Sequence, residues 1–304
     1  MYSKKCADKA NTKHLTADAL FGVSHVTAIV TGGGTGIGLM IAQALQSNGA
    51  KVYITGRREE VLEETVQRYS TGPGSIHALP GDISEKDEAI RLAKELESKE
   101  PNGIHLLVNS AGILIDDDTE FSVNGQPDMK DAKAISEHFL KTKPEQWAQT
   151  MKTNVTGPYY MSLAFLPLLS KGGANTPGYS SQIINITSAA GATKGTSNGR
   201  PAYAASKAAA THLSRMLATT FKDAKVRVNV IAPGVFPSEM TVDASDEDKN
   251  TLDQTMKTPA RRPGEDSDMA GTILFLAGKG GLFYNGQILY PEGGTMIVQP
   301  AIGN

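Results

Sequence analysis

The chain contains little of several residue types that mark particular classes of protein. It has a single cysteine, Cys6, among its 304 residues, which excludes an intrachain disulfide framework and a cysteine-rich zinc site. Its 30 lysines and arginines and 32 aspartates and glutamates give a net charge of -2, so the basic excess typical of a nucleic-acid-binding protein is missing. The 6 histidines are scattered without the spacing of metal ligands, and we expect no metal site.

Long apolar runs are also missing. A membrane-spanning helix needs roughly 18 or more consecutive apolar residues, and no segment approaches that length. The closest stretch, Tyr159–Leu169, is shorter and contains Ser162 and Pro167. The stretch 1–22 carries charges but not the apolar centre of a secretory signal. We therefore expect a cytoplasmic protein with no membrane span.

Apolar residues make up 39% of the chain, which is enough to form a sizeable core. Short apolar runs alternate with segments whose apolar residues recur at helical spacing. This alternation is typical of α/β proteins, in which helices cover both faces of a parallel sheet. The expected strands are His25–Val30, Val52–Ile54, Ile76–Leu79, Ile104–Val108, Gln182–Ile186, Val226–Ile231 and Gln287–Tyr290. The expected helices are Gly36–Asn48, Arg58–Tyr69, Ser84–Ser98 with a capping box at its start, Glu145–Leu169, Ala202–Phe221 and Asp266–Ala277.

Two segments interrupt the alternation. Leu114–Lys143 is rich in Asp, Glu and Lys and is interpreted as an insertion or long loop, whereas Phe236–Pro263 is polar with an acidic centre. Long loops in compact domains often serve as lids or binding loops, so we expect the second segment to border a substrate. Residues 1–24 are interpreted as an N-terminal extension, and residues 25–304 as one domain.

A glycine cluster, Thr31–Gly38, follows the first expected strand and opens the first expected helix. Glycine lets the backbone turn sharply and approach a pyrophosphate, while the helix N-terminus offers N–H groups and the positive end of a dipole. An ordinary tight turn also uses glycine, but the strand–turn–helix context favours a dinucleotide site. The residues expected to line this site are Gly32, Gly34, Thr35, Gly36, Ile37 and Gly38.

The end of the second expected strand indicates which dinucleotide would bind. NAD sites usually place an acidic residue there for the ribose 2′-hydroxyl, whereas this strand ends Ile54-Thr-Gly-Arg-Arg58. Arg57 can form charge-assisted hydrogen bonds with a 2′-phosphate, which favours NADP(H) over NAD(H). The alternative is a solvated position at the helix start, which fits Arg58 better. Further residues expected along the cofactor are Asp82 and Ile83, after the third strand, and Asn109, Ala111 and Gly112, after the fourth.

A second constellation points to proton transfer. Tyr203 and Lys207 are separated by one helical turn and project from the same face. A tyrosine with the ordinary pKa of about 10 is a poor base, and a nearby ammonium would lower that pKa. Ser188 ends the fifth expected strand, at the edge where parallel sheets bind ligands. Asn154 lies inside an apolar helical stretch, where it either bonds to nearby backbone or has a further role.

In their order along the chain, these elements resemble the short-chain dehydrogenase/reductase family over the span Val26 to Gly294. The matching elements are Thr31-Gly-x-x-x-Gly-x-Gly38, Asn109-x-Ala-Gly112, Asn154, Ser188, Tyr203-x-x-x-Lys207 and Pro233-Gly234. The resemblance implies a single doubly wound Rossmann-type α/β domain with a seven-stranded parallel sheet. It also implies a homodimer or homotetramer.

The resemblance further implies roles for individual residues. Tyr203 would donate a proton in reduction and accept one in oxidation, with Lys207 lowering its pKa and holding the nicotinamide ribose. Ser188 would orient and polarise the carbonyl, and Asn154 would hold a water that relays protons through Lys207. The residues implied beside the nicotinamide are Pro233, Gly234, Phe236 and Ser238.

The chain departs from the family pattern in two places that bear on the substrate. The 15 positions from Ser188 to Tyr203 exceed the usual spacing, with the extra residues in Lys194–Arg200, and the insertion Leu114–Lys143 is longer than usual. We predict an NADP(H)-dependent carbonyl reductase or alcohol dehydrogenase acting on a medium-sized, mostly apolar ketone, with no nucleic-acid partner. Two alternatives keep the fold, namely a non-redox NADPH-binding regulator and an isomerase or cyclase of a biosynthetic pathway.

Overall fold

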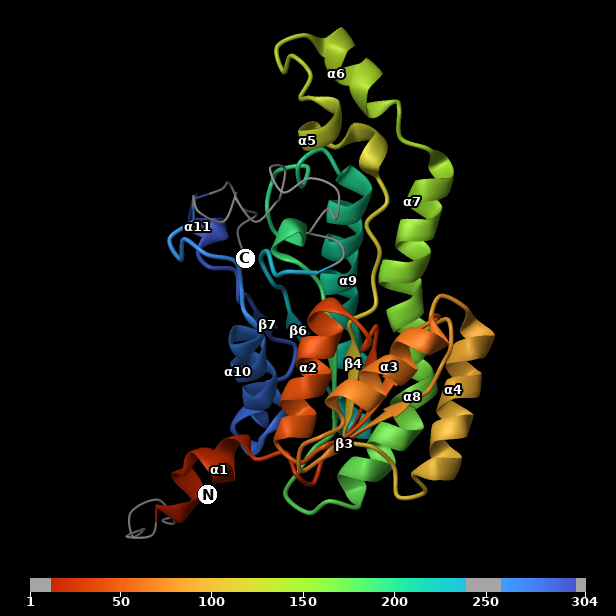
Figure 1. The fold of residues 1–304 in the computed structure, drawn as a ribbon, viewed down its shortest axis with the longest axis vertical. Coiled ribbons are helices and arrows are strands. Elements are labelled where there is room, and N and C mark those ends of the chain that lie inside the picture. Colours follow the sequence, from red (N-terminus) through yellow and green to blue (C-terminus); the bar gives the residue numbers. More distant parts are fainter. Residues whose placement is uncertain (1–11, 239–257, 299–304) are drawn as a thin grey trace.

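The computed structural model describes residues 12–238 and 258–298 and contains a seven-stranded parallel sheet in the order β3-β2-β1-β4-β5-β6-β7 (Figure 1). This confirms the doubly wound α/β fold. The strands are β1 (Thr27–Thr31), β2 (Lys51–Thr55), β3 (Ser75–Ala78), β4 (Leu106–Asn109), β5 (Gln182–Ile186), β6 (Arg227–Ile231) and β7 (Ile288–Leu289). The helices are α1 (Ala17–Phe21), α2 (Gly36–Ser47), α3 (Glu59–Tyr69), α4 (Lys86–Lys99), α5 (Phe121–Asn124), α6 (Ala132–Phe139), α7 (Pro144–Met151), α8 (Gly157–Ala174), α9 (Pro201–Thr220), α10 (Asp266–Ala277) and α11 (Thr295–Val298).

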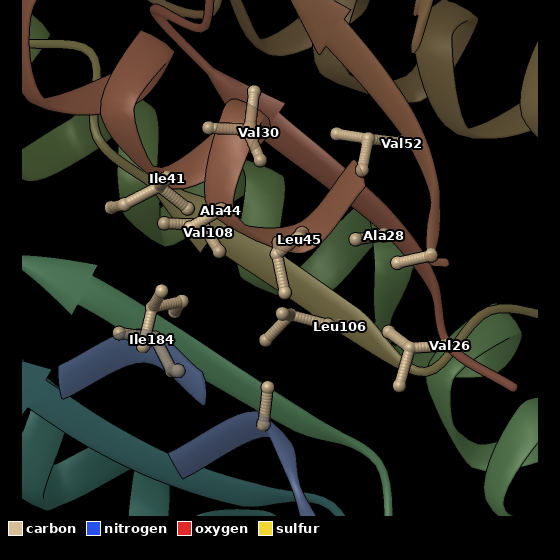
Figure 2. Packing of buried hydrophobic residues seen from close by; sticks show 14 of the residues in the cluster. Val26, Ala28, Val30, Ile41, Ala44, Leu45, Val52, Leu106, Val108 and Ile184 are labelled. Carbon is tan, nitrogen blue, oxygen red and sulfur yellow. The ribbon is translucent and has the colours of Figure 1, made fainter. Parts of the chain in front are cut away.

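The sheet separates two apolar layers, because successive strand residues point to opposite faces. In β1, Ala28 and Val30 join the layer formed with α2 and α10, whereas Ile29 joins the layer formed with α4, α8 and α9. Figure 2 shows the first layer, in which Leu45 of α2 lies close to Leu106 of β4. Since both faces are covered, the strands read as continuous apolar runs in the sequence.

The long helix expected at Glu145–Leu169 occurs, but it contains a segment with π-helical hydrogen bonding. A π-helical segment, Lys152–Thr156, separates α7 from α8, and Pro158 lies in the first turn of α8. Proline lacks the N–H that a continuous α-helix needs, and a Cβ on Gly157 would collide with Ile83, so the chain must pass here without a side chain. The segment carries the buried Asn154.

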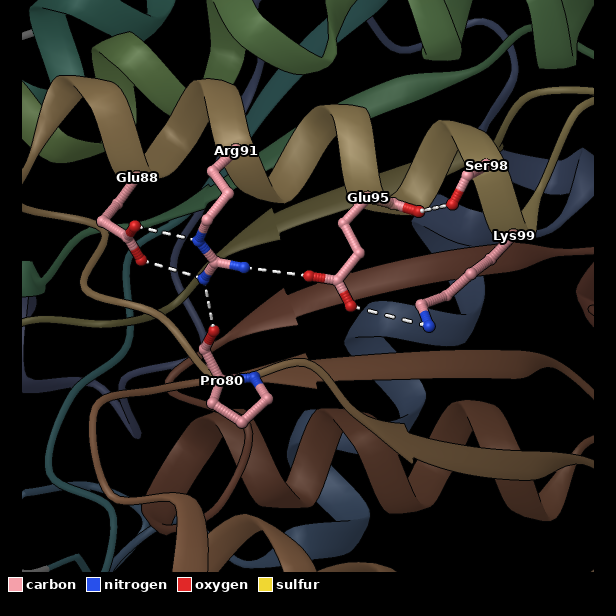
Figure 3. Close-up of polar contacts among 6 residues, drawn as sticks. All are labelled: Pro80, Glu88, Arg91, Glu95, Ser98 and Lys99. Carbon is pink, nitrogen blue, oxygen red and sulfur yellow. Dashed lines mark hydrogen bonds and ion pairs between the residues drawn. The ribbon is translucent and has the colours of Figure 1, made fainter.

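The capping box expected at the start of α4 is wrong. The N-cap of α4 is Glu85, which makes no side-chain capping bond, and the N–H of Ser84 donates instead to Asp82 Oδ1 (2.9 Å). On the outer face of α4, Arg91 donates to Glu88, Glu95 and the carbonyl of Pro80 (2.6 Å), as Figure 3 shows. These exposed ion pairs contribute little stability, but the bond to Pro80 holds the stretch after β3 against the helix.

The segment Leu114–Lys143 contains short helices rather than a plain loop. It includes α5 and α6. In Figure 1 it lies beyond the N-terminus of α9, on the side of the sheet where the strands have their carboxyl ends. Among the helices of the described residues, none is long and apolar enough to cross a membrane.

Candidate active site

The strand order reverses between β1 and β4. From β1 the chain continues to β2 and β3 on one side, and from β4 it continues to β5, β6 and β7 on the other. Ligands of doubly wound folds bind at such a switch point, beyond the carboxyl ends of the strands. The glycine cluster, the Asn109–Gly112 segment and Ser188 all follow the carboxyl ends of β1, β4 and β5. The predicted cofactor and catalytic residues therefore share one edge of the sheet.

The turn after β1 has a backbone that only glycine accommodates at several positions. Gly32 and Gly36 adopt φ values of 64° and 51°, in the left-handed region. A Cβ on Gly32 would lie 2.9 Å from the Cα of Ala111, and one on Gly38 would collide with the carbonyl oxygen of Gly32. Thr35 is the N-cap of α2 and makes no side-chain capping bond, so it leaves the helix N-terminus to a ligand.

The remaining predicted cofactor residues follow the carboxyl ends of β1, β2 and β3. Gly34 accepts a hydrogen bond from Thr65 Oγ1 (3.2 Å), and Ile37 packs against the core beneath the turn. Arg57 is exposed beyond β2, and Ile83 is buried beyond β3, next to the partly buried Asp82. These positions border the same edge of the sheet as the glycine turn.

A buried polar network ties β1, β4 and β5 together beneath this edge. Thr31 Oγ1 accepts hydrogen bonds from the N–H groups of Ser110 (3.0 Å) and Ala111 (2.9 Å). Asn109 Nδ2 donates to Asn185 Oδ1 (2.8 Å), and Asn185 in turn donates to Ser214 of α9. Sequence reasoning named Thr31 only as the first residue of the glycine cluster. It missed Asn185 and Ser214, although a lone Asn within the apolar strand Gln182–Ile186 is a signal that could have found Asn185.

Tyr203, Lys207 and Ser188 come together. Lys207 Nζ lies 5.6 Å from the centroid of the Tyr203 ring, and it donates to the carbonyl of Ile186 (3.2 Å) at the end of β5. The Ser188 side chain hydrogen-bonds the Tyr203 phenol and also accepts from the N–H of Ala190 (3.1 Å). The phenol, the hydroxyl and the ammonium thus form one cluster at the sheet edge.

Asn154 bridges the Asn109–Gly112 segment and α9. Its Oδ1 accepts from the N–H of Ile113 (2.8 Å), and its Nδ2 donates to the Ile113 carbonyl (2.9 Å) and to Ser206 Oγ (3.0 Å). A Cβ on Gly112 would lie 3.2 Å from Asn154 Oδ1 and 3.3 Å from Lys207 Nζ, so Gly112 leaves room between these two side chains. Asn154 therefore bonds to backbone of another segment, Ile113, and its side chain also lies next to the cluster of Tyr203, Ser188 and Lys207.

Burial is the largest influence on both titratable groups of the cluster. It raises the pKa of Tyr203, against the lowering effects of the Ser188 hydrogen bond and the Arg200 charge, and the Asp116 charge raises that pKa further. Burial lowers the pKa of Lys207 to about 8. In the protein without cofactor, the pKa of Tyr203 is therefore raised, opposite to the direction expected from the neighbouring lysine. The sequence spacing on which that expectation rested does not reveal how deeply the phenol is buried. Sequence reasoning also missed Asp116 and Arg200.

The segment after β6 reaches the glycine turn from the opposite side. The carbonyl of Pro233 accepts from the N–H of Ala189 (2.9 Å), and a Cβ on Gly36 would lie 3.0 Å from the Cβ of Ser238. Gly234 packs against Glu292, where a Cβ would lie 2.8 Å from the Glu292 Cα. A cavity of about 130 Å³ is lined by the buried Phe236 and by residues of the 258–268 and 291–295 stretches. The centre of the expected substrate loop, residues 239–257, lies outside the described residues.

The described parts of the chain contain no group of at least 3 His, Cys, Asp or Glu side chains that could hold a metal ion. The chemistry that the cluster itself can perform is proton transfer from the phenol, with a hydroxyl and an ammonium beside it. The adjoining glycine turn, with its helix N-terminus, can accept a phosphate group.

Comparison with known proteins gives a consistent picture. A family model described as short chain dehydrogenase matches residues 26–249. The chain is 39% identical over 293 residues to the short-chain dehydrogenase/reductase PhomF′ of Diaporthe leptostromiformis, covering 95% of this chain and 98% of the relative. It is 34% identical to the rhamnolipids biosynthesis 3-oxoacyl-[acyl-carrier-protein] reductase of Pseudomonas aeruginosa, covering 90% of this chain and 97% of that one. The solved Pseudomonas aeruginosa RhlG/NADP active-site complex superposes with a TM-score of 0.76 at 33% identity, covering 90% of this chain and 98% of that chain.

Proposed function

The chain belongs to the short-chain dehydrogenase/reductase family, and from that premise we propose that it transfers hydride between NADP(H) and a ketone or secondary alcohol. The observation that carries the proposal is the cluster of Tyr203, Ser188 and Lys207, which lies at the same sheet edge as the glycine turn. Reduction is the favoured direction, because cells generally keep NADPH reduced.

The residues at this edge fit a dinucleotide. The glycines of the turn have no side chains, so the backbone there is open to a ligand at positions that added Cβ atoms would fill. The turn leads directly into the N-terminus of α2, which can bind a phosphate group. We propose that the exposed guanidinium of Arg57 pairs with the 2′-phosphate. We also propose that the partly buried Asp82 and the buried Ile83 border the adenine. We assign the rest of the cofactor surface to Asn109, Ala111, Gly112, Pro233, Gly234, Phe236 and Ser238, together with Tyr203 and Lys207. When bound, NADPH supplies the hydride that the side chains cannot provide.

The side chains supply the proton. In reduction, the Tyr203 phenol gives its proton to the substrate oxygen as the carbonyl becomes an alcohol, and in oxidation the phenolate takes a proton back. Ser188, which already hydrogen-bonds the phenol, orients the same substrate oxygen. Lys207 Nζ lies 5.6 Å from the centroid of the phenol ring, and Asn154 lies next to Lys207 across Gly112, where a water could relay protons.

For the substrate we propose a medium-sized, mostly apolar ketone. The Pseudomonas aeruginosa relative is named for its action on 3-oxoacyl-carrier substrates, which supports a carbonyl on an apolar chain. We also propose a homodimer or homotetramer, which is supported by large apolar side chains exposed on two long helices, Tyr159 and Leu163 on α8 and Met216 on α9. Size-exclusion chromatography with light scattering tests the second proposal, and an observed monomer would contradict it.

A substrate panel tests the proposed reaction. NADPH consumption is followed with aliphatic, aromatic and polycyclic ketones and quinones, in parallel with NADH. We expect NADPH oxidation with at least one apolar ketone and a clear preference over NADH. Tight NADPH binding without turnover across the panel would favour the regulator, and a rearranged product formed without NADPH consumption would favour the isomerase or cyclase.

A further inference from the structure

We propose that Asp116 and Arg200 are positioning residues for Tyr203, which together fix the first turn of α9 and set the charge balance around its phenol. This inference rests on the proposed role of Tyr203 as the proton donor. It concerns two side chains outside the four proposed catalytic residues, in the two segments where the chain departs from the family pattern.

Asp116 acts as the cap of the helix that carries Tyr203. It is fully buried (0% exposed), and its Oδ2 accepts from the backbone N–H groups of Ala202 (2.9 Å) and Tyr203 (3.3 Å). The residue at the N-cap position itself, Arg200, makes no side-chain capping bond. The carboxylate therefore satisfies the amides of the first turn from a segment 86 positions earlier, and its negative charge complements the helix dipole.

Arg200 connects the same helix end to the insertion. Its side chain is 13% exposed and forms an ion pair with Glu120, whose side chain is 8% exposed. Thr119 Oγ1 donates to the carbonyl of Gly199 (2.6 Å), and the N–H of Phe121 donates to the carbonyl of Asn198 (2.9 Å). The insertion and the loop before α9 thus form one substructure that ends at Tyr203.

The loop before α9 contains two consecutive non-glycine residues in a left-handed backbone conformation. Ser197 and Asn198 have φ values of 52° and 60°, in the left-handed region that side chains rarely occupy. Such residues persist where their surroundings fix them, as the contacts with the insertion do here. The strain lies directly before the helix that positions the phenol.

The two charges act on the phenol in opposite directions. Asp116 raises the pKa of Tyr203 and Arg200 lowers it, while burial raises that pKa and the Ser188 hydrogen bond lowers it. Lys207 is a further charged group facing the ring, with its Nζ 5.6 Å from the centroid. Glu120 forms an ion pair with Arg200, and burial raises the pKa of the nearby Asp117 carboxyl, against the lowering effect of the Arg200 charge.

Asp116→Asn separates a simple cap from an electrostatic positioning residue. The asparagine carbonyl can still accept from the two helix amides, and its NH₂ takes the place of Oδ1, a buried atom with no hydrogen-bond partner among the described residues. The acceptor that caps the helix is therefore kept, while the charge is lost and two N–H donors replace Oδ1. A simple cap would tolerate this substitution, whereas a charge that acts on Tyr203 would not.

The experiment compares Asp116→Asn and Arg200→Met with three matched variants. Arg200→Lys keeps the positive charge, Asp131→Asn makes the same change at the exposed N-cap of α6, and Arg91→Met removes an arginine from the outer face of α4. Two readouts are used. One is the pH profile of kcat for NADPH-dependent reduction, and the other is the phenolate absorbance titration of the protein without cofactor, with the Tyr203→Phe titration subtracted.

We expect Asp116→Asn to move both curves to lower pH and Arg200→Met to move them to higher pH, with the matched variants at the wild-type position. Folded Asp116→Asn and Arg200→Met proteins whose curves stay at the wild-type position, or shift in the same direction, would overturn the proposal. If circular dichroism shows that one of the two fails to fold, the direction seen for the other decides. The titration needs no turnover, so a wild-type protein without reductase activity would contradict the proposed function and leave this test intact.

Discussion

Stability should depend on pH in the mildly acidic range through His105, which is buried at the amino end of β4. Its Nδ1 accepts from the N–H of Thr27 (3.0 Å), its Nε2 hydrogen-bonds Thr176 Oγ1 (2.8 Å), and its ring lies 6.0 Å from that of His25. Burial, assisted by the charge of His25 and opposed by Glu100, lowers the pKa of His105 from 6.5 to about 4. The folded protein therefore resists a proton that the unfolded chain accepts.

The sign and size of the effect follow from these two pKa values. Well above pH 6.5 the ring is neutral in both states and has no effect on the pH dependence of stability. As the pH falls below 6.5, only the unfolded chain takes up the proton, so the free energy of unfolding drops by about 1.4 kcal/mol for each pH unit until the folded pKa is reached. Between about pH 7 and about pH 5, where most carboxylates stay ionised, the loss is about 2 kcal/mol.

Urea unfolding at these two pH values measures this loss. In His105→Asn, the asparagine oxygen can still accept from the Thr27 amide, and the histidine titration is removed. We expect the variant to lose about 2 kcal/mol less than the wild type between the two pH values, whatever its stability at neutral pH. His212→Asn, an exposed change on α9, is the control and should behave as the wild type. Equal losses in His105→Asn and wild type would refute the reasoning.

Two further predictions concern the cofactor and the core. Arg57→Ala should weaken NADPH binding about 10- to 100-fold, as expected for lost charge-assisted hydrogen bonds, and leave NADH binding unchanged. Arg68→Ala, in the last turn of α3, is the control and should change neither. Fluorescence titration measures both affinities, and equal effects of Arg57→Ala on the two cofactors would contradict the role of Arg57. Leu45→Ala should reduce the free energy of unfolding by about 2–5 kcal/mol, because the side chain is 0% exposed between α2 and β4, and a loss below about 1 kcal/mol in denaturant unfolding would contradict this packing.

Local signals in the sequence were sufficient for the fold. The strand Gln182–Ile186 and the helix Asp266–Ala277 occur with the expected bounds, because strand runs and helical periodicity are read from neighbouring residues. The π-helical segment Lys152–Thr156 within the expected helix was not predicted, and neither was the close approach of Gly157 to Ile83, a contact between distant segments.

The site was predictable to the extent that it depends on spacing. Tyr203 and Lys207 share a face because one helical turn separates them, and the carboxyl end of β5 brings Ser188 to them. The cap from Asp116 and the direction of the Tyr203 pKa shift were not predictable, because they depend on long-range contacts and on burial. The same holds for the packing of Glu120 against Arg200.

The central claim is that Tyr203 is the proton donor at a nicotinamide site. The most direct measurement compares Tyr203→Phe with the wild type for NADPH-dependent reduction of the best ketone and for NADPH affinity in the same preparation. We expect kcat to fall by at least about 10²- to 10⁴-fold, the usual contribution of a general acid, while the dissociation constant for NADPH changes little. Turnover of Tyr203→Phe at the wild-type rate would contradict the claim.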